Sequence, residues 1–230
     1  MAYSGDVMTG GPAALRELDD LVVRKLAVGP MTNNAYLLTC RATGAQLLID
    51  AADDAAGLAG LIRAGSPAGR LDLVLTTHRH PDHQAALADV VAITGAPTAA
   101  GADDAAGITV PTTRRLRHGD LVAIGDLTLE VISLRGHTPG SVALAYREPA
   151  VVTEADAAPG RTHLFTGDSL FPGGPGRTAD ATAFTSLLDD LVSRVFDRLG
   201  DDTWVYPGHG ADTTLGAERP HLAEWRARGW

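Results

Sequence analysis

The sequence predicts an α/β fold with mixed β-sheets. Predicted strands come in runs, and helices are interspersed among them along the whole chain, as in sheets covered by helices. A chain of 230 residues, 45% of them hydrophobic, fits one large domain or two small ones and has enough apolar residues for a sizeable core. No linker, repeat or low-complexity segment divides it. We therefore expect a glycine-rich surface arm at residues 1–20 and a single domain over residues 21–230.

Ten strands are predicted from short apolar runs that are bounded by turn residues. In chain order they are 21–28, 35–41, 46–50, 71–76, 97–100, 121–124, 127–133, 141–147, 163–166 and 203–206. The turns at 42–45 and at Gly125-Asp126 are short enough to join their flanking strands into hairpins. The segments 101–117 and 148–161 are polar or acidic with little pattern, and we expect loops there.

Three helices are predicted from apolar residues at helical spacing, over 51–63, 82–94 and 181–199. The first carries Asp53 and Asp54 near its start, where the helix dipole favours carboxylates. The second follows Pro81, a usual place for proline at a helix entrance. The third is the longest, and its apolar side chains form one stripe.

Composition and charge argue against several classes of function. A net charge of -9 and a pI near 5.2 do not fit a nucleic-acid surface, which needs a basic stripe. No apolar run approaches the roughly 20 residues that cross a bilayer, and no signal-peptide pattern is present. The single cysteine, Cys40, excludes an internal disulfide and is expected to be a small buried side chain. We expect a cytoplasmic monomer or small homo-oligomer that acts on small molecules, without nucleic-acid or membrane partners.

Residues 78–83, with the sequence His-Arg-His-Pro-Asp-His, give the strongest functional signal. Alternation in a strand can place His78 and His80 on one face, and a turn can then bring Asp82 and His83 back toward them. The whole chain holds only 8 histidines, so packing alone does not explain three within this segment. Imidazole and carboxylate donors together suit zinc, iron or manganese rather than calcium or magnesium. The segment therefore predicts neighbouring ligand sets for two metal ions.

Three later segments share one form, a strand followed by a glycine-flanked turn that carries a metal-binding side chain. They are Gly136-His137-Thr138-Pro139-Gly140, Thr166-Gly167-Asp168-Ser169 and Pro207-Gly208-His209-Gly210. Glycine lets the backbone turn sharply and approach closely, so such side chains can reach a shared centre. A single histidine in a glycine turn is more often a solvated loop residue, but together with the first cluster the three turns predict one metal site.

A resemblance to the metallo-β-lactamase fold superfamily extends over nearly the whole chain. It is carried by seven metal-binding side chains: His78, His80, Asp82, His83, His137, Asp168 and His209. Within the superfamily, residues 207–210 with Thr213-Thr214-Leu215-Gly216-Ala217-Glu218 are similar to the shorter bacterial glyoxalase II-type enzymes, which are hydroxyacylglutathione hydrolase-like. The resemblance implies a four-layer αββα sandwich with two mixed sheets and the metals at one edge between them.

The resemblance also implies which side chains bind each metal. His78, His80 and His137 would form the first site, Asp82, His83 and His209 the second, and Asp168 would bridge them. The ions would be two divalent metals, zinc with iron or manganese as alternatives. They would deliver a metal-bound hydroxide to the carbonyl of a thioester, a hydroxyacyl-thiol, or a related ester.

Four further roles are expected around this site. Asp82 and Asp168 are the expected catalytic carboxylates, and Asp82 can supply acid help, although a thiolate leaves with little of it. Arg177, in the glycine-rich segment after Asp168, is expected either to bind a substrate carboxylate or to lie in solvent. Asp50, at the end of a strand, is expected either to support a metal ligand from behind or to cap the next helix.

Several other functions fit the same residues. A lactonase or a β-lactamase uses the same scaffold. A persulfide dioxygenase of the superfamily binds one iron through the equivalents of His78, His137 and Asp168, although this chain keeps the second ligand set as well. A non-catalytic metal-binding domain is a further class. Only 21 residues follow His209, so we expect no counterpart of the helical domain that holds glutathione in longer glyoxalase II enzymes, and the thiol carrier stays open.

Overall fold

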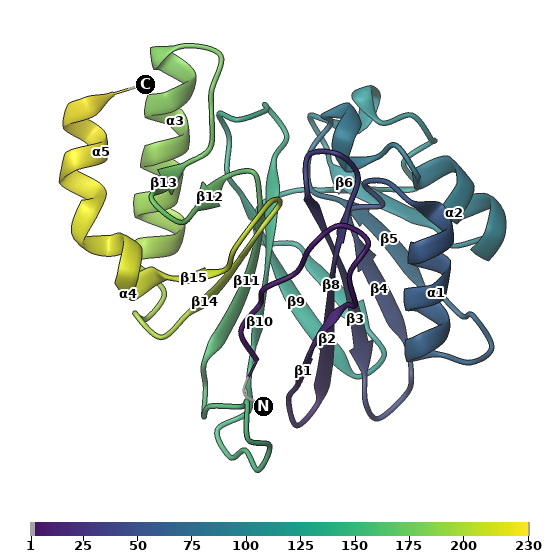
Figure 1. Ribbon diagram of the computed structural model, residues 1–230. Helices are drawn as coiled ribbons and strands as arrows, with labels where there is room; N and C mark the ends of the chain where they lie inside the picture. The colour runs from purple at the N-terminus through teal and green to yellow at the C-terminus, as the bar shows by residue number, and fades with distance from the viewer. Residues whose placement is uncertain (1–2, 230) are drawn as a thin grey trace.

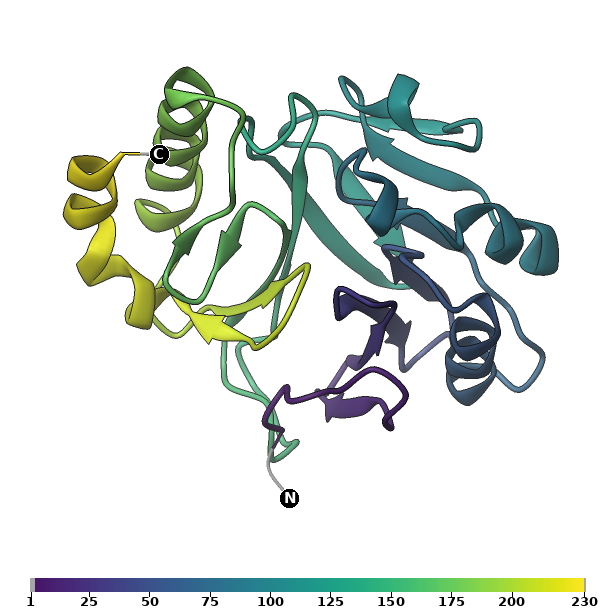
Figure 2. The ribbon, with the colours of Figure 1, turned by 45° about the horizontal axis from the view of Figure 1, so that its top comes forward.

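The computed structural model describes residues 3–229 of the chain. Two β-sheets pack face to face, and each carries helices on its outer face (Figure 1; Figure 2). The prediction of a four-layer αββα sandwich with two mixed sheets is therefore confirmed. Met1, Ala2 and Trp230, at the ends of the predicted arm and domain, lie outside the described residues.

The first sheet has 7 strands among the described residues, and they follow one another in chain order. They are β1 (Ala14–Glu17), β2 (Leu21–Val28), β3 (Asn33–Cys40), β4 (Gln46–Ile49), β5 (Leu73–Thr76), β6 (Thr98–Gly101) and β7 (Arg114–Leu116). Strands β1 to β4 pair antiparallel, whereas β4 to β7 pair parallel. Helix α1 (Ala55–Gly65) connects β4 to β5, and α2 (Leu87–Thr94) connects β5 to β6. Because parallel strands end at the same edge, Asp50 and His78 emerge side by side from β4 and β5.

The second sheet has 6 strands in the described part of the chain, in the order β15-β14-β11-β10-β9-β8. They are β8 (Leu121–Ile124), β9 (Leu127–Ser133), β10 (Val142–Arg147), β11 (Thr162–Gly167), β14 (Trp204–Pro207) and β15 (Thr213–Thr214). Of the pairings that the described residues form in this sheet, only that of β11 with β14 is parallel. Consequently Asp168 and His209 follow the same ends of two neighbouring strands.

Smaller elements complete this half of the molecule. A two-stranded ribbon of β12 (Leu170–Phe171) and β13 (Gly174–Pro175) follows β11. Helices α3 (Ala181–Leu191), α4 (Leu215–Glu218) and α5 (Leu222–Arg228) lie on the outer side of the second sheet (Figure 1). No helix in residues 3–229 has the length and apolarity that crossing a membrane requires.

Apolar side chains fill the three interfaces between the four layers. Strand β3 is buried along its whole length, because it has a layer on either side. Its Leu38 belongs to the core between the two sheets, whereas its neighbour Leu37 packs with Leu58 of α1. On the second sheet, Leu144 faces the inter-sheet core and Ala143 packs against α3. The alternation of strand side chains therefore accounts for all three interfaces.

The predicted helix over 82–94 was wrong at its start. Pro81–His83 form a 3-10 turn, and α2 begins only at Leu87. Between them, the N–H groups of Ala85 and Ala86 donate to the carbonyls of Ala52 and Ala51 instead of to a helical turn. This turn aims Asp82 and His83 at the sheet edge, which a continuous helix would not do.

Other boundaries also differ from the prediction. Helix α1 begins at Ala55 rather than at residue 51, because Asp54 caps it by accepting from the N–H of Gly57. The helix predicted over 181–199 is α-helical to Leu191 and then continues as a π-helical turn over Val192–Phe196. The 1–20 segment contributes β1 and the polar 101–117 segment contributes β7. Both are short edge strands with few apolar residues, so their alternation signal is weak.

Candidate metal centre

The seven predicted metal-binding side chains lie together at one edge of the sandwich. They come from four segments, which follow the carboxyl ends of β5, β9, β11 and β14. Three groups of donors, each with its ligand atoms within 4.8 Å of one another, are formed: His78, His80 and His137; His78, His83 and Asp168; Asp82, His83 and His209. The structure therefore brings all seven predicted residues into one cluster.

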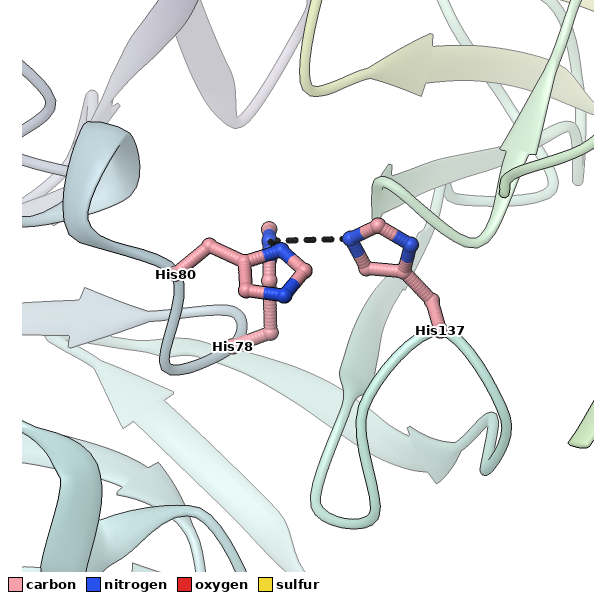
Figure 3. Close-up of side chains that lie close together, drawn as sticks. All are labelled: His78, His80 and His137. Carbon is pink, nitrogen blue, oxygen red and sulfur yellow. Dashed lines mark hydrogen bonds between the residues drawn. The ribbon is translucent and has the colours of Figure 1, made fainter. Parts of the chain in front are cut away.

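The first donor set consists of three imidazoles whose rings point toward one another (Figure 3). Nε2 of His78 lies 3.1 Å from Nδ1 of His80 and 3.2 Å from Nε2 of His137. Nitrogen ligands about 2.0–2.1 Å from a tetrahedral zinc ion are separated from one another by about 3.3 Å. The three nitrogen atoms thus have the spacing of three corners of one coordination tetrahedron.

The second donor set shows the same spacing. Nε2 of His83 lies 3.2 Å from Nε2 of His209 and 3.5 Å from Oδ2 of Asp82. The remaining edge, from Nε2 of His209 to Oδ2 of Asp82, is 3.4 Å long. The two imidazoles and the carboxylate can therefore bind a second metal ion of similar size.

Asp168 lies between the two sets. Its Oδ1 is 3.3 Å from Nε2 of His83, and its Oδ2 is 3.6 Å from Nε2 of His137 and 3.5 Å from Nε2 of His209. Among the described residues, Oδ1 is buried without a hydrogen-bond partner. Leaving a charged buried acceptor unpaired costs about 1–3 kcal/mol or more, which a bound cation would remove. The carboxylate thus fits the bridging position that the resemblance implies.

Asp50 and Thr77 orient one ligand from each set. Oδ2 of Asp50 accepts from Nδ1 of His83 at 2.8 Å and from the hydroxyl of Thr77, also at 2.8 Å. Because that hydroxyl donates to Asp50, it accepts from Nδ1 of His78, 3.0 Å away. Both imidazoles consequently donate from Nδ1 and turn Nε2 inward, as metal-bound histidines do. The helix-cap interpretation of Asp50 is wrong, since Asp54 caps α1.

Backbone carbonyls orient two further imidazoles in the same way. Nδ1 of His137 donates to the carbonyl of Arg177 at 2.6 Å, and Nδ1 of His209 donates to the carbonyl of Met31 at 3.0 Å. A carbonyl oxygen can only accept, so Nδ1 of each ring is the donor and, in the neutral ring, Nε2 carries the lone pair. In the neutral rings the Nε2 lone pairs converge at 3.2 Å, where they repel one another unless a cation lies between them. The donor set therefore fits two divalent metal ions.

The charges of the site shift the pKa values of its members. Burial disfavours the charged form of His83, but Asp50 and Asp168 outweigh it and raise the pKa of His83 to about 10. Burial and the charge of His83 hold the pKa of His78 well below its usual value. Burial alone would raise the pKa of Asp168, but the neighbouring His209 and His83 keep it well below its usual range. Since a metal ligand must be a neutral imidazole, metal binding displaces a proton from His83.

Asn33 is a member of the site that the sequence alone did not reveal. Its buried side chain donates from Nδ2 to Oδ2 of Asp82 at 2.8 Å, and its backbone forms a β-bridge with His209. It therefore supports two members of the second donor set. The only signal in the sequence is the polar pair Asn33-Asn34 at the start of an apolar strand.

Arg177 lies beside the first donor set. It lines a cavity of about 300 Å³ together with His80, His137, Thr178 and Ala179. Its side chain is exposed, and no residue within 3–229 accepts a hydrogen bond from its guanidinium group. The guanidinium group is therefore available to an anionic ligand, while the carbonyl of the same residue orients His137.

Comparisons of sequence place this chain among known proteins. The family model of the metallo-β-lactamase superfamily matches residues 28–209. A hydroxyacylglutathione hydrolase of Fuscovulum blasticum is 38% identical over 150 residues, which are 65% of this chain and 52% of that protein. A hydroxyacylglutathione hydrolase of Polaromonas sp. is 33% identical over 191 residues, 82% of this chain and 66% of that protein. The chain thus spans about half to two thirds of the length of these curated relatives.

Several solved structures are similar to this chain in both fold and sequence. The BLEG-1 B3 metallo-β-lactamase is 26% identical with a TM-score of 0.72, over 87% of this chain and 97% of that one. ETHE1 from Myxococcus xanthus is 28% identical with a TM-score of 0.68, over 87% and 82%. TTHA1623, solved in a di-iron-bound form, is 30% identical with a TM-score of 0.64, over 85% and 96%. The family match over most of the chain, the sandwich and the clustered donors together establish that this chain belongs to the metallo-β-lactamase superfamily.

Proposed function

We propose that the chain is a dinuclear, metal-dependent hydrolase that cleaves small acyl-thiols, with an activity like that of hydroxyacylglutathione hydrolase. The observation that carries the proposal is the position of Asp168, whose two oxygens lie within 3.6 Å of ligand nitrogens from both donor sets. The names of the curated relatives support the substrate class.

The side chains divide into two binding sets and one bridge. The first ion would be held by His78, His80 and His137. The second ion would be held by Asp82, His83 and His209. Two such ions, when bound, supply an activated water and polarise the substrate carbonyl. Asp168 would fix their separation. No protein nucleophile is required, and Cys40 is buried in the core between the sheets.

Arg177 and Asp82 would act on the substrate itself. A carboxylate of the acyl-thiol would pair with the exposed guanidinium of Arg177 beside the first donor set. A guanidinium group can bind a carboxylate through two parallel hydrogen bonds. The thiolate leaves with little acid help because thiol pKa values are low. Where acid help is needed, Asp82 would supply it, held in place by its hydrogen bond from Asn33.

The proposal is tested with metal-free protein that is reloaded with zinc, iron or manganese. Hydrolysis of S-lactoylglutathione and related acyl-thiols is measured for the wild type, Asp168→Ala and the control Asp89→Ala, an exposed carboxylate on α2. We expect Asp168→Ala to lose at least about 100-fold in kcat, since it removes the group that places both ions, and Asp89→Ala to match the wild type.

Three outcomes would redirect the proposal. Equal rates for Asp168→Ala and the wild type would overturn the mechanism. Turnover of lactones with no turnover of any acyl-thiol would change the substrate class only. One iron per chain, with oxygen uptake on glutathione persulfide, would replace hydrolysis by persulfide oxidation.

A further inference from the structure

Lys25 of β2 is a fully buried lysine beneath the loop that carries His209. Its side chain is 0% exposed, and its partner Asp212 is 2% exposed. The ammonium donates to Oδ1 of Asp212 at 2.7 Å and to the carbonyls of Gly5 and Gly210, each at 2.8 Å. All three of its protons are therefore used. Burying two charges is costly, and apolar residues of similar volume would avoid that cost, so stability alone does not account for this pair.

The ion pair of Lys25 and Asp212 connects three parts of the chain, which are β2, the N-terminal segment and the loop after His209. Gly5 belongs to the N-terminal segment, Gly210 follows His209, and Asp212 ends the same loop. Asp212 also accepts from the hydroxyl of Tyr3 at 3.0 Å and from Nε1 of Trp204 at 2.9 Å. The N-terminal segment and the loop are thus fastened to one buried carboxylate.

The loop is also held by the neighbouring strand β3. The side-chain amide of Asn34 donates to the carbonyls of Pro207 and Gly210 at 3.0 and 2.9 Å, and its backbone N–H donates to the carbonyl of Gly208 at 2.7 Å. The carbonyl of Gly210 consequently receives one charged and one neutral donor. A loop with glycines on both sides of His209 has little stiffness of its own, so these contacts set where His209 lies.

We propose that Lys25 and Asp212 are positioning residues for the second metal ion. They fix the loop over residues 207–212 so that Nε2 of His209 stays 3.2 Å from Nε2 of His83 and 3.4 Å from Oδ2 of Asp82. The N-terminal segment takes part through Gly5 and Tyr3. This inference rests on the proposed assignment of His209 to the second ion, and its test separates the two.

The experiment compares zinc binding by four metal-free proteins. They are the wild type, His209→Ala as a reference without the ligand, the double variant Lys25→Met with Asp212→Asn, and the control Arg161→Met with Glu148→Gln. The control removes another largely buried ion pair, with Nε of Arg161 2.9 Å from Oε1 of Glu148, where β10 ends and β11 begins. Both zinc-binding steps are followed by competition with a chromophoric chelator, and cobalt absorption reports the coordination of each step.

We expect the Lys25/Asp212 double variant to weaken the binding step that His209→Ala abolishes. The expected loss is about 10–100-fold, as for other residues that orient a metal ligand. The zinc affinity of the other step should stay within about twofold of the wild type. In the Arg161/Glu148 control, both affinities should stay within about twofold, although its melting temperature falls by as much as that of the Lys25/Asp212 double variant. The single variant Asp212→Asn preserves volume and folding more closely and should show a smaller loss at the same step.

The outcomes that contradict the inference differ from those that contradict the function. Wild-type affinity at both steps in Asp212→Asn and in the double variant would overturn the positioning role. Equal weakening of both steps would also overturn it, because it would indicate general loosening of the fold. Two unchanged zinc steps in His209→Ala would instead refute the assignment of His209, and with it the proposed two-metal function.

Discussion

Nδ1 of His83 lies 2.8 Å from Oδ2 of Asp50, and both side chains are buried where β4 and β5 end. Asp50 has a left-handed backbone with a φ of 58°, and its Oδ1 accepts from the N–H of Thr77 at 2.7 Å. One carboxylate therefore fixes the turn that leads to His78 and also orients His83. Each of the two donor sets depends on Asp50 for one of its members.

Asp50→Asn is expected to lower the affinity for the second metal ion by about 10–100-fold. Asparagine tolerates the left-handed conformation and has nearly the same shape, so the main change is the loss of the charge that raises the pKa of His83. Zinc affinity, measured by chelator competition, checks the prediction. Asp54→Asn is the matched control, because Asp54 also has a left-handed backbone, with a φ of 51°, but only caps α1. Equal affinities in the two variants would contradict the role of Asp50.

Removal of metal is expected to lower the melting temperature. At a free zinc concentration of 100 times Kd, binding adds about 2.7 kcal/mol to the free energy of unfolding, which corresponds to about 5–11 °C in a domain of this size. Thermal unfolding is compared in zinc and in chelator for the wild type and for His137→Ala, which lacks one nitrogen of the first set. The shift should shrink in the variant. A shift of the same size in both proteins would show that zinc stabilises the fold elsewhere.

Much of the fold was predictable from local pattern. Strands β2, β8 and β9 have the predicted bounds, because each is a short apolar run that ends at clear turn residues. The pairing of β11 with β14 was not visible in any periodicity, and the sandwich itself came from the resemblance. The start of α2 was mispredicted because Ala85 and Ala86 bond to a neighbouring segment, which local propensity does not encode.

The metal-binding side chains were predictable because clustered histidines are rare and have a distinctive chemistry. The residues that support them were not predictable. Lys25 is the only lysine of the sequence and Asn33 is one of two asparagines, but neither residue type by itself indicates a metal site, and Thr77 is an ordinary threonine. Each gains its role only from its neighbours in space. Lys25, for example, pairs with a carboxylate 187 positions away. Spacing in the sequence gives no indication of such a contact.

Arg177→Met is expected to raise KM about 10-fold for acyl-thiols that carry a carboxylate, the equivalent of about 1.4 kcal/mol of binding. Methionine keeps much of the apolar stem but removes the charge that faces the cavity. Neutral acyl-thiols should change by less than about twofold. Steady-state kinetics on matched charged and neutral substrates checks this expectation, and an equal rise in KM for both would indicate that Arg177 acts only on the shape of the cavity.

Glu218→Ala is expected to impair substrate binding indirectly, through the segment that precedes Arg177. Buried Glu218 of α4 accepts from the N–H of Gly173 at 2.9 Å and from the hydroxyl of Thr213 at 2.7 Å, so it fastens the segment that leads to Arg177. Loss of that acceptor should raise KM about 5-fold, or about 1 kcal/mol. When Arg177 is already replaced by Met, Glu218→Ala should cause no further rise in KM, because Glu218 affects substrate binding only through Arg177. Additive effects in this cycle would contradict the connection between them.

The buried histidine of β11 is expected to make the fold acid-sensitive. His163 is 0% exposed, with Nε2 2.8 Å from Oε1 of Glu148 and Nδ1 2.8 Å from the hydroxyl of Tyr206. Burial outweighs the attraction of Glu148 and lowers the pKa of His163 to about 4. In the unfolded chain this imidazole takes up its proton near pH 6.5, whereas the folded protein resists protonation down to about pH 4. The stabilisation is therefore complete above pH 6.5 and is lost as the pH falls toward 4.

Urea unfolding of chelator-treated protein at pH 7 and pH 5 measures this effect. The wild type should lose about 2 kcal/mol more over this interval than His163→Gln, whose side chain keeps a donor and an acceptor but does not titrate. The metal-binding histidines are present in both proteins, so their contribution cancels in the comparison. Equal losses in the two proteins would show that His163 is already protonated in the fold, with Glu148 as its charged partner.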